Sequence, residues 1–586
     1  MPAAATSAGG DEPVLSLRDV SFTYLEGEKP ALSHFDLQVP QGDFLGIIGP
    51  SGAGKTTLAA VLSGAIPHHY RGTFQGVAMV CGMDTVEVEL TDVSRAVGSV
   101  LQDIDAQMIS SNVEDEMLYG LENFGVPHAE IPDRLEWALR TVGIQDLLHR
   151  EVSTLSGGQK QKVAIAAILA IRPRVMVLDE PTAALDPASS RSVFETLRLL
   201  NEEEGITVVV IEQKVALLSE YCRHMAVLAE GSLRFHGTPR EVFAHGEELR
   251  ALGVDSPRVT RVSNQLARYG LTPTNEVCLN VEEAVETVAR VVGDRGAGFE
   301  VARRTVSEEP PVGRPVLNFD HVGFSYGMGG ASVEDLTFQV RHGELVGVIG
   351  QNGAGKTTTT KLINGLLRPS RGTVEVCGEK TTSQRTSQIA RHVSTLFQDP
   401  DRQLCKNTVL EEVAFSLQLL GVADDVATER ARSVVSRFAL PEDAAPFSLS
   451  RGQRQIVALA SVVVTEPDVL VLDEPTSGLD YRECMEVMAA VDEMRRKGCG
   501  VVMVCHDMEV VSDFASRLIV MANGRILADG APADVFGDGE LLARAYVSAP
   551  QVAQLSKRLA DEVSPAFGGI TEVHDIVEVT RGLARQ

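Results

Sequence analysis

Two glycine-rich segments of the same form each end in a lysine followed by two threonines. The pattern Gly-x-x-x-x-Gly-Lys-Thr, directly after an apolar run, is typical of a loop whose backbone N–H groups turn inward around phosphate oxygens. The helix that follows would present its positive N-terminus to the same anion. The lysine would reach the β- and γ-phosphates, and the first threonine would ligate Mg²⁺. The expected nucleotide-binding residues of these loops are Gly49, Ser51, Gly52, Gly54, Lys55, Thr56 and Thr57, and then Gly350, Asn352, Gly353, Gly355, Lys356, Thr357 and Thr358.

An Asp-Glu pair follows a second apolar run behind each glycine-rich loop. Asp179 and Asp473 end these runs, where a carboxylate can hold Mg²⁺ beside a phosphate loop. Glu180 and Glu474 come next and must point elsewhere, so we expect each to polarise an attacking water as a general base. Alone, such a pair is more often a capped strand end. Behind a phosphate loop it indicates nucleotide hydrolysis.

A serine with a glutamine three residues later precedes each Asp-Glu pair, and this spacing predicts a capping box that opens a helix. A helix N-terminus bearing a serine hydroxyl and glycine amides is a second anion site. One domain needs only one triphosphate cradle, so we expect this second site to close over the nucleotide of a partner domain. The apolar face of the first predicted helix is Val163, Ala166, Ala167 and Ala170. The capping motifs are Ser156, Gly157, Gly158 and Gln159, and then Ser450, Arg451, Gly452 and Gln453.

These motifs recur in the same order because the chain contains two copies of one sequence unit. Lys55 and Lys356 lie 301 residues apart, and Asp179 and Asp473 lie 294 residues apart. Within each copy, short β-branched runs alternate with helical patterns, which predicts the buried strands of an α/β sheet. The expected domains are two phosphate-loop nucleotide-binding domains at 13–245 and 314–546, a C-terminal appendage with a linker at 246–313, and a second appendage at 547–586.

The appendages are predicted from a weaker internal repeat. Residues 257–266 resemble residues 550–559 at a spacing of 293. Asn280 and Glu283 predict the capped start of a further helix. The true linker is then only about 306–314, and a disordered tether over the whole stretch is the alternative. The first predicted helix has its apolar stripe at Val259, Val262 and Leu266.

The composition of the 586 residues excludes several classes of protein. Hydrophobic residues at 44% and charged residues at 23% are typical of a soluble globular chain with more than one core. Lys+Arg at 53 against Asp+Glu at 80 gives a net charge of −27, which argues against a protein that coats nucleic acid. No apolar run approaches the ~18–20 residues of a membrane-spanning helix, and Met1–Gly10 has no signal-peptide pattern. We therefore expect a cytosolic protein that does not itself cross a membrane.

The cysteines form no C-x-x-C motif and no metal-ligand cluster in the sequence. We expect them to be buried thiols in a reducing compartment. The eight are Cys81, Cys222, Cys278, Cys377, Cys405, Cys484, Cys499 and Cys505.

Taken together, the motifs resemble those of the ATP-binding cassette (ABC) ATPases over most of the chain. Glutamine loops at Gln102 and Gln398 and D-loops at Ala184–Asp186 and Gly478–Asp480 complete the pattern. The resemblance implies ATP hydrolysis with Mg²⁺ in an intramolecular head-to-tail pseudo-dimer. Each ATP would lie between the phosphate loop of one domain and the signature of the other, and the signatures are the capping motifs Ser156–Gln159 and Ser450–Gln453. The implied catalytic residues are Glu474, His506, Glu180, Gln398 and Gln102. The implied magnesium ligands are Thr56, Gln102, Asp179, Thr357, Gln398 and Asp473.

The same resemblance implies that Tyr24 and Tyr326 stack on adenine, a plausible use of an amphipathic ring. A strand tyrosine packed on the core is the alternative for each of them.

The two composite sites are not expected to be equal. Gln213 occupies the position of His506, the histidine that contacts the γ-phosphate in the family, and glutamine cannot become cationic or shuttle a proton. Arg451 replaces the first glycine of the second signature. In a head-to-tail pair both departures fall in the site of Lys55. The hypothesis is that the Lys356 site is the main hydrolytic centre, although Glu180 is intact and Arg451 could itself pair with phosphate.

The segment Gln398–Gln403 and the appendages resemble energy-coupling-factor (ECF) ATPases, which power micronutrient uptake. The first copy, Gln102–Gln107, is a looser version that lacks the proline. This resemblance implies a peripheral motor on the cytoplasmic face of the cell membrane, docked on a membrane scaffold subunit and a substrate-binding membrane subunit, with no nucleic-acid partner. The transported substrate is not encoded in this chain.

Other tandem cassettes are the alternatives. A ribosome-acting ATPase would have a long basic linker, but residues 246–314 contain nine Arg, no Lys and eleven Asp or Glu. A DNA-maintenance ATPase would have zinc cysteines or a long coiled coil, and neither pattern occurs. The ATPase of another importer, such as a sugar importer, is a nearer alternative that the appendage disfavours.

Overall fold

The computed structural model describes residues 13–25, 27, 29–183, 185–293, 313–327 and 332–584. Met1–Gly10, Ala184 of the first D-loop and residues 306–312 of the expected linker lie outside the described residues. The described chain divides into two compact units. The first contains the residues up to Leu185 with Ser189–Asp255, and the second contains Asp186–Ala188 with the residues from Ser256 onward.

The first unit contains a six-stranded, mainly parallel sheet, as the buried apolar runs predicted. Its order is β10-β9-β3-β8-β7-β6, and β10 is antiparallel to β9. Its strands are β3 (Phe44–Ile48), β6 (Val97–Val100), β7 (Val175–Asp179), β8 (Thr207–Ile211), β9 (His224–Ala229) and β10 (Ser232–Gly237). A second, antiparallel sheet of order β2-β1-β4-β5 consists of β1 (Leu15–Tyr24), β2 (Leu32–Val39), β4 (Gly72–Val80) and β5 (Met83–Asp84).

Helices connect the strands of the first unit, and one buried cluster joins its two sheets. Leu15 of β1, Ile47 of β3 and Leu58 of the first helix belong to this cluster. Every residue of β3, β7 and β8 is buried, which is why their sequences are continuously apolar and do not alternate. The helices are α1 (Lys55–Leu62), α2 (Ala65–His68), α3 (Leu90–Ala96), α4 (Ile104–Gln107), α5 (Val113–Asn123), α6 (Ile131–Val142), α7 (Gly157–Ala170), α8 (Pro187–Glu204), α9 (Val215–Tyr221), α10 (Pro239–Phe243) and α11 (Gly246–Leu252).

The second unit repeats this plan with a parallel sheet of order β16-β17-β18-β13-β19-β20 and an antiparallel sheet of order β12-β11-β14-β15. Its strands are β11 (Pro315–Ser325), β12 (Ser332–Arg341), β13 (Leu345–Ile349), β14 (Arg371–Val376), β15 (Glu379–Lys380), β16 (Val393–Leu396), β17 (Val469–Asp473), β18 (Gly500–Val504), β19 (Arg517–Ala522) and β20 (Arg525–Gly530). The helices of its cassette are α14 (Lys356–Ile363), α15 (Thr386–Ile389), α16 (Val409–Leu419), α17 (Asp424–Arg437), α18 (Arg451–Val463), α19 (Tyr481–Arg496), α20 (Met508–Phe514), α21 (Pro532–Gly537) and α22 (Gly539–Ala545).

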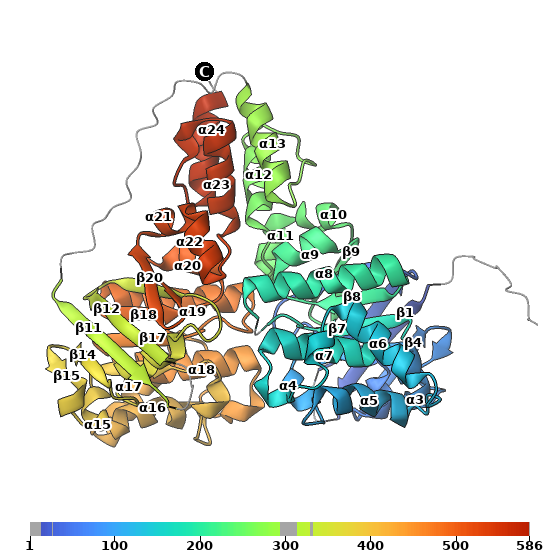
Figure 1. The fold of residues 1–586 in the computed structure, drawn as a ribbon, viewed down its shortest axis with the longest axis horizontal. Helices are drawn as coiled ribbons and strands as arrows, with labels where there is room; N and C mark the ends of the chain where they lie inside the picture. Colours follow the sequence, from blue (N-terminus) through green and yellow to red (C-terminus); the bar gives the residue numbers. More distant parts are fainter. Residues whose placement is uncertain are drawn as a thin grey trace, which may run out of the picture. The chain divides into compact units, whose positions relative to one another are not determined.

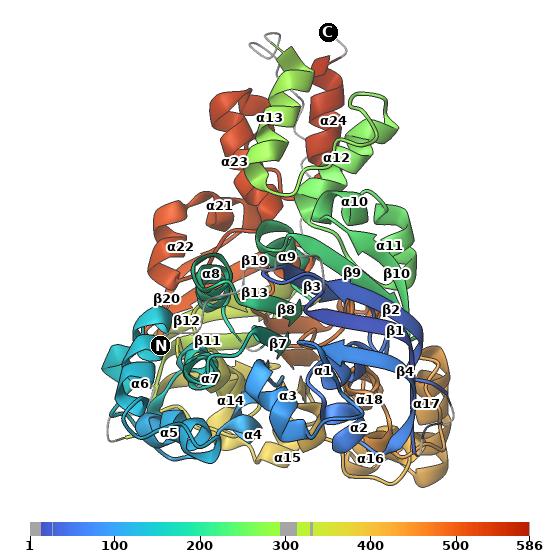
Figure 2. The ribbon, with the colours of Figure 1, turned by 90° about the vertical axis from the view of Figure 1, so that its right-hand side faces the viewer.

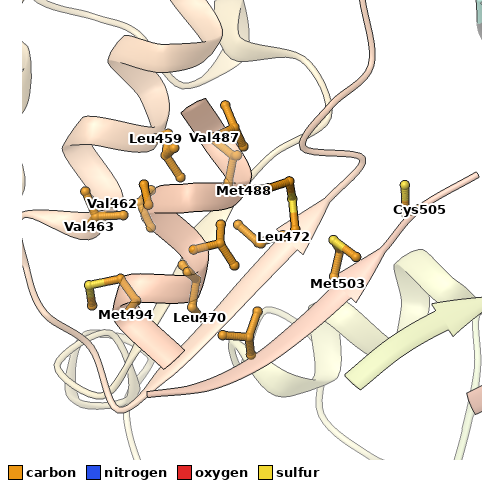
Figure 3. Close-up of a cluster of buried hydrophobic side chains, with 14 of the residues drawn as sticks. Leu459, Val462, Val463, Leu470, Leu472, Val487, Met488, Met494, Met503 and Cys505 are labelled. Carbon is orange, nitrogen blue, oxygen red and sulfur yellow. The ribbon is translucent and has the colours of Figure 1, made fainter. Parts of the chain in front are cut away.

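Figure 3 shows the hydrophobic core beside β17. Leu470 and Leu472 of β17 lie among side chains of α18 and α19, including Leu459 and Met488, and all four are buried. This packing fixes β17 and therefore the position of the Asp-Glu pair at its end.

Helices from both predicted appendages pack together in the second unit and share one hydrophobic cluster (Figures 1 and 2). The predicted apolar stripe of the first helix is buried, and the Glu283 N–H donates to the Asn280 side chain at 2.9 Å, as the capping prediction requires. The first appendage is therefore folded and is not a disordered tether over its described residues. The four helices are α12 (Arg258–Arg268), α13 (Val281–Val292), α23 (Gln551–Glu562) and α24 (Val573–Ala584).

An ion-pair cluster ties the first appendage to the second cassette. Arg258 of α12 contacts the Glu509 and Asp513 carboxylates of α20 at 3.3 and 2.6 Å, and its side chain is only 12% exposed. Burial raises the pKa of Glu509 to about 7, against the opposing effect of Arg258. The corresponding residues of the first cassette are Ala216 and Glu220, so this anchor has no equivalent pair of carboxylates in the other copy.

Two further expectations concern the whole chain. Among the described residues, no helix combines the length and the apolar composition that a membrane span requires. The expectation that the cysteines are buried thiols is wrong for Cys377 and Cys405, which are exposed, and Cys81 is half-buried. The reason is local, because Cys377 occupies a tight turn at the surface.

Candidate nucleotide-binding sites

Both phosphate loops connect a fully buried strand to a helix that begins at the motif lysine. In the first loop Gly52 and Gly54 have φ of +72° and +96°, and in the second Gly353 and Gly355 have φ of +81° and +103°. Only glycine adopts these conformations without strain, so the loop geometry itself requires the motif glycines. The loops thus have the form that the sequence pattern predicted.

The motif lysines fold back over their own loops. Lys55 Nζ donates to the carbonyl oxygens of Gly49 and Pro50 at 2.7 and 2.8 Å, and Lys356 Nζ donates to the equivalent carbonyls at 2.7 and 2.9 Å. Burial lowers the pKa of Lys356 to about 8, although the Glu474 carboxylate opposes this shift. A bound triphosphate would supply opposite charge and stabilise the ammonium form.

Hydroxyl and carboxylate oxygens meet beside the first loop, where a magnesium ion would lie. The Thr56 side chain hydrogen-bonds to the Asp179 carboxylate; burial still raises the pKa of Asp179, while this bond and the charge of Lys55 lower it. In the second copy burial, and then the charge of Glu474, raise the pKa of Asp473 to about 6. Oxygen ligands of this kind suit Mg²⁺, and a cation would stabilise their ionised form. The residues therefore fit a nucleotide-bound magnesium ion.

Glu180 is held between two side-chain amides. Gln102 Nε2 donates to its Oε2 at 2.6 Å and Gln213 Nε2 donates to its Oε1 at 2.7 Å. Burial, together with the negative charges of Glu212 and Asp179, raises the pKa of Glu180 to about 6. Both oxygens of this carboxylate thus face neutral donors.

Glu474 has an amide on one side and an imidazole on the other. Gln398 Nε2 donates to its Oε2 at 2.9 Å, and His506 Nε2 lies 3.1 Å from its Oε1. Burial by itself raises the pKa of Glu474, but the hydrogen bond and charge of His506, assisted by Lys356 and Gln398, hold the pKa below the ordinary value. The two glutamates therefore differ in protonation chemistry although their motifs are identical.

The backbone turns each glutamate away from the preceding aspartate. Glu180 and Glu474 have φ of +47° and +52°, a region that non-glycine residues rarely adopt. Their N–H groups donate to the carbonyls of Ile211 and Val504, both at 2.8 Å. Such strained positions cluster at functional sites.

A buried polar network that the sequence patterns missed lies beside Glu180. The Glu212 side chain is 2% exposed and accepts a hydrogen bond from the Thr182 hydroxyl. Lys214 Nζ donates to the Thr182 carbonyl and to the Ser190 hydroxyl, each at 2.8 Å. In the second copy Cys505 occupies the position of Glu212. The available signal was a charged residue directly after the apolar strand Thr207–Ile211.

Both predicted capping boxes form. Ser156 Oγ accepts from the Gln159 N–H at 3.3 Å, and Gln159 Oε1 accepts from the Ser156 N–H at 3.0 Å. Ser450 and Gln453 make the same pair of bonds at 3.2 and 3.1 Å. Both serines are exposed, so each signature helix presents its N-terminus at the surface of the described chain.

Arg451 distinguishes the second signature. Its side chain lies against Gly478 of the D-loop, where an added Cβ would stand 3.3 Å from Arg451 Nε. The next residue, Gly452, lies against the Glu483 side chain, and a Cβ there would stand 2.2 Å from the Glu483 carboxylate, so a larger residue would displace this side chain. The substitution to arginine is therefore accommodated on the exposed side of the helix start.

Each glutamine loop continues into a short helix capped by an aspartate. An ion pair then ties this segment to the signature helix of the same copy, Asp105 with Lys160 in the first and Asp401 with Arg454 in the second, both at 2.6 Å. The looser first copy, without the proline, keeps the same connection. Each glutamine loop is thus connected by an ion pair to the signature helix of its own copy.

The two tyrosines differ in their surroundings. The Tyr24 hydroxyl lies 3.1 Å from the Thr57 hydroxyl, which places the ring beside the first phosphate loop. Tyr326 is 49% exposed at the end of β11, and its ring makes an edge contact with Phe324. Stacking of these rings on adenine stays a prediction.

The first unit therefore brings together Lys55, Thr56, Asp179, Glu180, Gln102 and Gln213. The second brings together Lys356, Asp473, Glu474, Gln398 and His506. That each signature closes the site of the other copy stays a prediction, as do the roles of the individual residues.

Comparison with known proteins agrees with this geometry. Residues 32–183 and 333–477 each match the ABC transporter family. The chain belongs to that family, with two copies of its ATP-binding cassette. A protein of Caldanaerobacter subterraneus, provisionally named an ABC transporter ATP-binding protein, is 34% identical over 93% of this chain and 96% of its own length. A Bacillus subtilis protein, provisionally named an HMP/thiamine import ATP-binding protein (YkoD), is 30% identical over 90% of this chain and 93% of its own length.

Among solved structures, cbiO1 of Clostridium perfringens, described as part of the ABC transporter complex cbiONQ, is 29% identical with a TM-score of 0.38. It covers 44% of this chain and 98% of its own. The ABC cassettes make this protein an ATPase subunit of an ABC transporter, and the family membership accounts for both phosphate loops, both signatures and both Asp-Glu pairs.

Proposed function

We propose that this ABC ATPase is the fused motor of an ECF-type importer, working at the cytoplasmic face of the cell membrane. The observation that carries the proposal is the folding of both appendages into one cluster of four helices, in a chain that has two cassettes. Such a cluster would keep the two halves of the chain connected while the two cassettes open and close. The import name of the Bacillus subtilis relative supports the direction of transport.

The two cassettes form a head-to-tail pair in this proposal, with one ATP between each phosphate loop and the signature of the other copy. The exposed N-termini of both signature helices are available to a γ-phosphate. Binding of two ATP molecules would draw the cassettes together, and hydrolysis would release them.

Hydrolysis occurs mainly at the Lys356 site. Glu474 accepts a proton from water as its oxygen attacks the γ-phosphorus, the bond to the β-phosphate oxygen breaks, and ADP and phosphate are the products. Lys356 and His506 hold the β- and γ-phosphates. Ser156, in the signature of the first copy, closes the site from the other side. Mg²⁺ bound by Thr357, Gln398 and Asp473 would neutralise phosphate charge.

The Lys55 site binds ATP and turns it over slowly. Its Gln213 amide already donates to Glu180, and it offers no ionisable group to the γ-phosphate. Arg451 adds a positive charge to the signature that would face this site, which favours retention of a bound phosphate. The Lys55 site therefore serves as a clamp that holds the two cassettes together between turnovers.

The surface beside the glutamine loops is the docking face for membrane subunits. Leu101 and Ile109 flank the first loop and are 54% and 63% exposed, and Phe397 precedes the second and is 39% exposed. Exposed apolar side chains next to a loop that contacts the catalytic glutamate can transmit movement of a membrane scaffold to the ATP site. The membrane scaffold and the substrate-binding subunit are separate chains in this proposal.

The experiment is coexpression with multi-span membrane proteins encoded by neighbouring reading frames, followed by membrane fractionation. We expect the protein to fractionate with membranes only when they are present, and Ile109→Asp with Phe397→Asp to release it. Leu199→Asp, at an exposed position of α8 remote in sequence from both loops, is the matched control and should remain bound. A protein that stays wholly in the supernatant beside such neighbours would contradict the docking proposal while leaving the ATPase assignment intact.

A further inference from the structure

Three side chains that can ligate a transition metal meet on the second cassette, away from the glycine loop. The Sγ of Cys377, a ring nitrogen of His392 and a carboxylate oxygen of Asp468 all lie within 4.8 Å of one another. His392 Nδ1 is 2.7 Å from Asp468 Oδ2. Cys377 precedes His392 by 15 residues and Asp468 by 91, so no local sequence motif brings them together.

The three residues come from two different sheets. Cys377 lies in the two-residue turn between β14 and β15, where it and Gly378 have φ of +51° and +82°. His392 and Asp468 stand directly before the first paired residues of the parallel strands β16 and β17, Val393 and Val469. The group thus connects the antiparallel sheet to the starting edge of the parallel sheet.

We propose that Cys377, His392 and Asp468 form a binding site for a divalent transition-metal ion of the Zn²⁺ class. Thiolate, imidazole and carboxylate are the ligand types that zinc takes in proteins, and three protein ligands leave a fourth position for water. Magnesium and calcium prefer sites made of oxygen ligands alone. The ion would occupy the opposite end of β17 from Asp473, about 16 Å away along a five-residue strand.

The geometry requires only small movements to accept the ion. Bonds of about 2.0–2.3 Å to a tetrahedral zinc place its ligand atoms roughly 3.3–3.8 Å apart, which is about 1.0–1.5 Å closer than the outer limit of 4.8 Å observed here. The His392 and Asp468 side chains are 42% and 44% exposed, and Cys377 is exposed, so rotamer changes suffice and water has access. Bound metal would replace the hydrogen bond between His392 and Asp468 and clip the β14–β15 turn to the parallel sheet.

The first cassette supplies an internal comparison. Cys81 occupies the same turn, with φ of +51° followed by Gly82 at +83°. The positions of His392 and Asp468 are Ala96 and Arg174 in that copy, and the charge of Arg174 acts on Cys81. Both copies thus have a cysteine in this turn, whereas the complete ligand set occurs only in the second copy.

The test is a titration of the purified, nucleotide-free full chain with Co²⁺, followed by displacement with Zn²⁺. Thiolate ligation of Co²⁺ produces a charge-transfer absorption that oxygen ligands of an ATP site do not give. We expect one ion per chain with this band, and its loss in both Cys377→Ser and His392→Ala. Cys81→Ser and Cys405→Ser, which change another partly exposed cysteine, should retain the band and the stoichiometry.

The result that overturns the proposal is a wild-type chain without the thiolate band, or a band that survives Cys377→Ser. If Cys377→Ser does not fold, His392→Gln at a half-exposed position decides the question, because loss of the band without loss of the circular dichroism spectrum supports the site. An unchanged band in a folded His392→Gln chain contradicts it.

Discussion

The surroundings of Glu180 and Glu474 differ more than their shared motif suggests. One glutamate is hydrogen-bonded by two neutral amides with Glu212 close by, and its pKa is raised to about 6. The other has an imidazole in place of one amide, and its pKa is held below the ordinary value. Two neighbouring positions contribute to this difference, Gln213 against His506 and Glu212 against Cys505. Duplication thus preserves the fold of a catalytic site while its electrostatics diverge.

The largest expected effect is on turnover after loss of the general base. Glu474→Gln should lower the ATPase rate by about 100-fold or more, because proton transfer by a positioned side chain contributes at least that much. Glu180→Gln should leave most of the turnover. The measurement is steady-state phosphate release by both variants, with ATP binding checked separately. Loss of activity in Glu180→Gln alone would reverse the assignment of the two sites.

The next effect concerns pH. In His506→Gln the histidine no longer lowers the pKa of Glu474, so this pKa should rise, because burial of the carboxyl raises it. Since the base acts in its ionised form, the turnover that remains should begin to decline at a higher pH than in the wild-type protein as the pH is lowered. The pH profile of kcat measures this shift. If kcat falls at the same acidic pH in both proteins, His506 does not determine the pKa of Glu474.

A smaller gain should follow from restoring the weaker site. In the Glu474→Gln background, Gln213→His with Arg451→Gly should raise residual turnover several-fold, because both departures from the family pattern are reversed. Gln213→Ala with Arg451→Gly is the matched control, since it removes the amide without supplying an imidazole. Residual phosphate release under single-turnover conditions measures the effect. Equal rates in both combinations would mean that the glutamine is not what limits this site.

The smallest expected change is in stability, at the anchor that only the second unit has. Arg258→Ala should lower the free energy of unfolding by about 2–3 kcal/mol, because it leaves the Glu509 and Asp513 carboxylates without their buried cation. Arg558→Ala, which breaks an exposed pair with Glu562, is the control and should change stability less. Denaturant unfolding of the full chain measures both, and equal losses would remove the distinction between the anchor and an ordinary surface ion pair.

The sequence predicted the parts of these sites that depend on local spacing. The phosphate loops require glycine at positive φ, the capping boxes require serine and glutamine three residues apart, and both features form as expected. The buried apolar strands were equally readable because strands covered on both faces need continuous hydrophobic residues.

Features built from distant positions were not readable in the same way. The network of Glu212 with Thr182 joins the ends of two strands, and the anchor of Arg258 joins residues about 250 positions apart. The sequence also did not predict the grouping of Cys377 with His392 and Asp468, because the spacing rules for metal-ligand clusters cover only short intervals. Tertiary proximity, and not local pattern, determines these sites.

The head-to-tail pairing of the two cassettes is the central claim, and a cysteine cross-link tests it most directly. Asn352→Cys in the second phosphate loop and Ser156→Cys in the first signature should be placed in a chain whose Cys81, Cys377 and Cys405 are serine. With ATP and the Glu474→Gln change, we predict a cross-link within one chain by a short thiol reagent, and none for Asn352→Cys with Ser450→Cys. Cross-linking of the second pair instead, or only between different chains, would contradict the pairing.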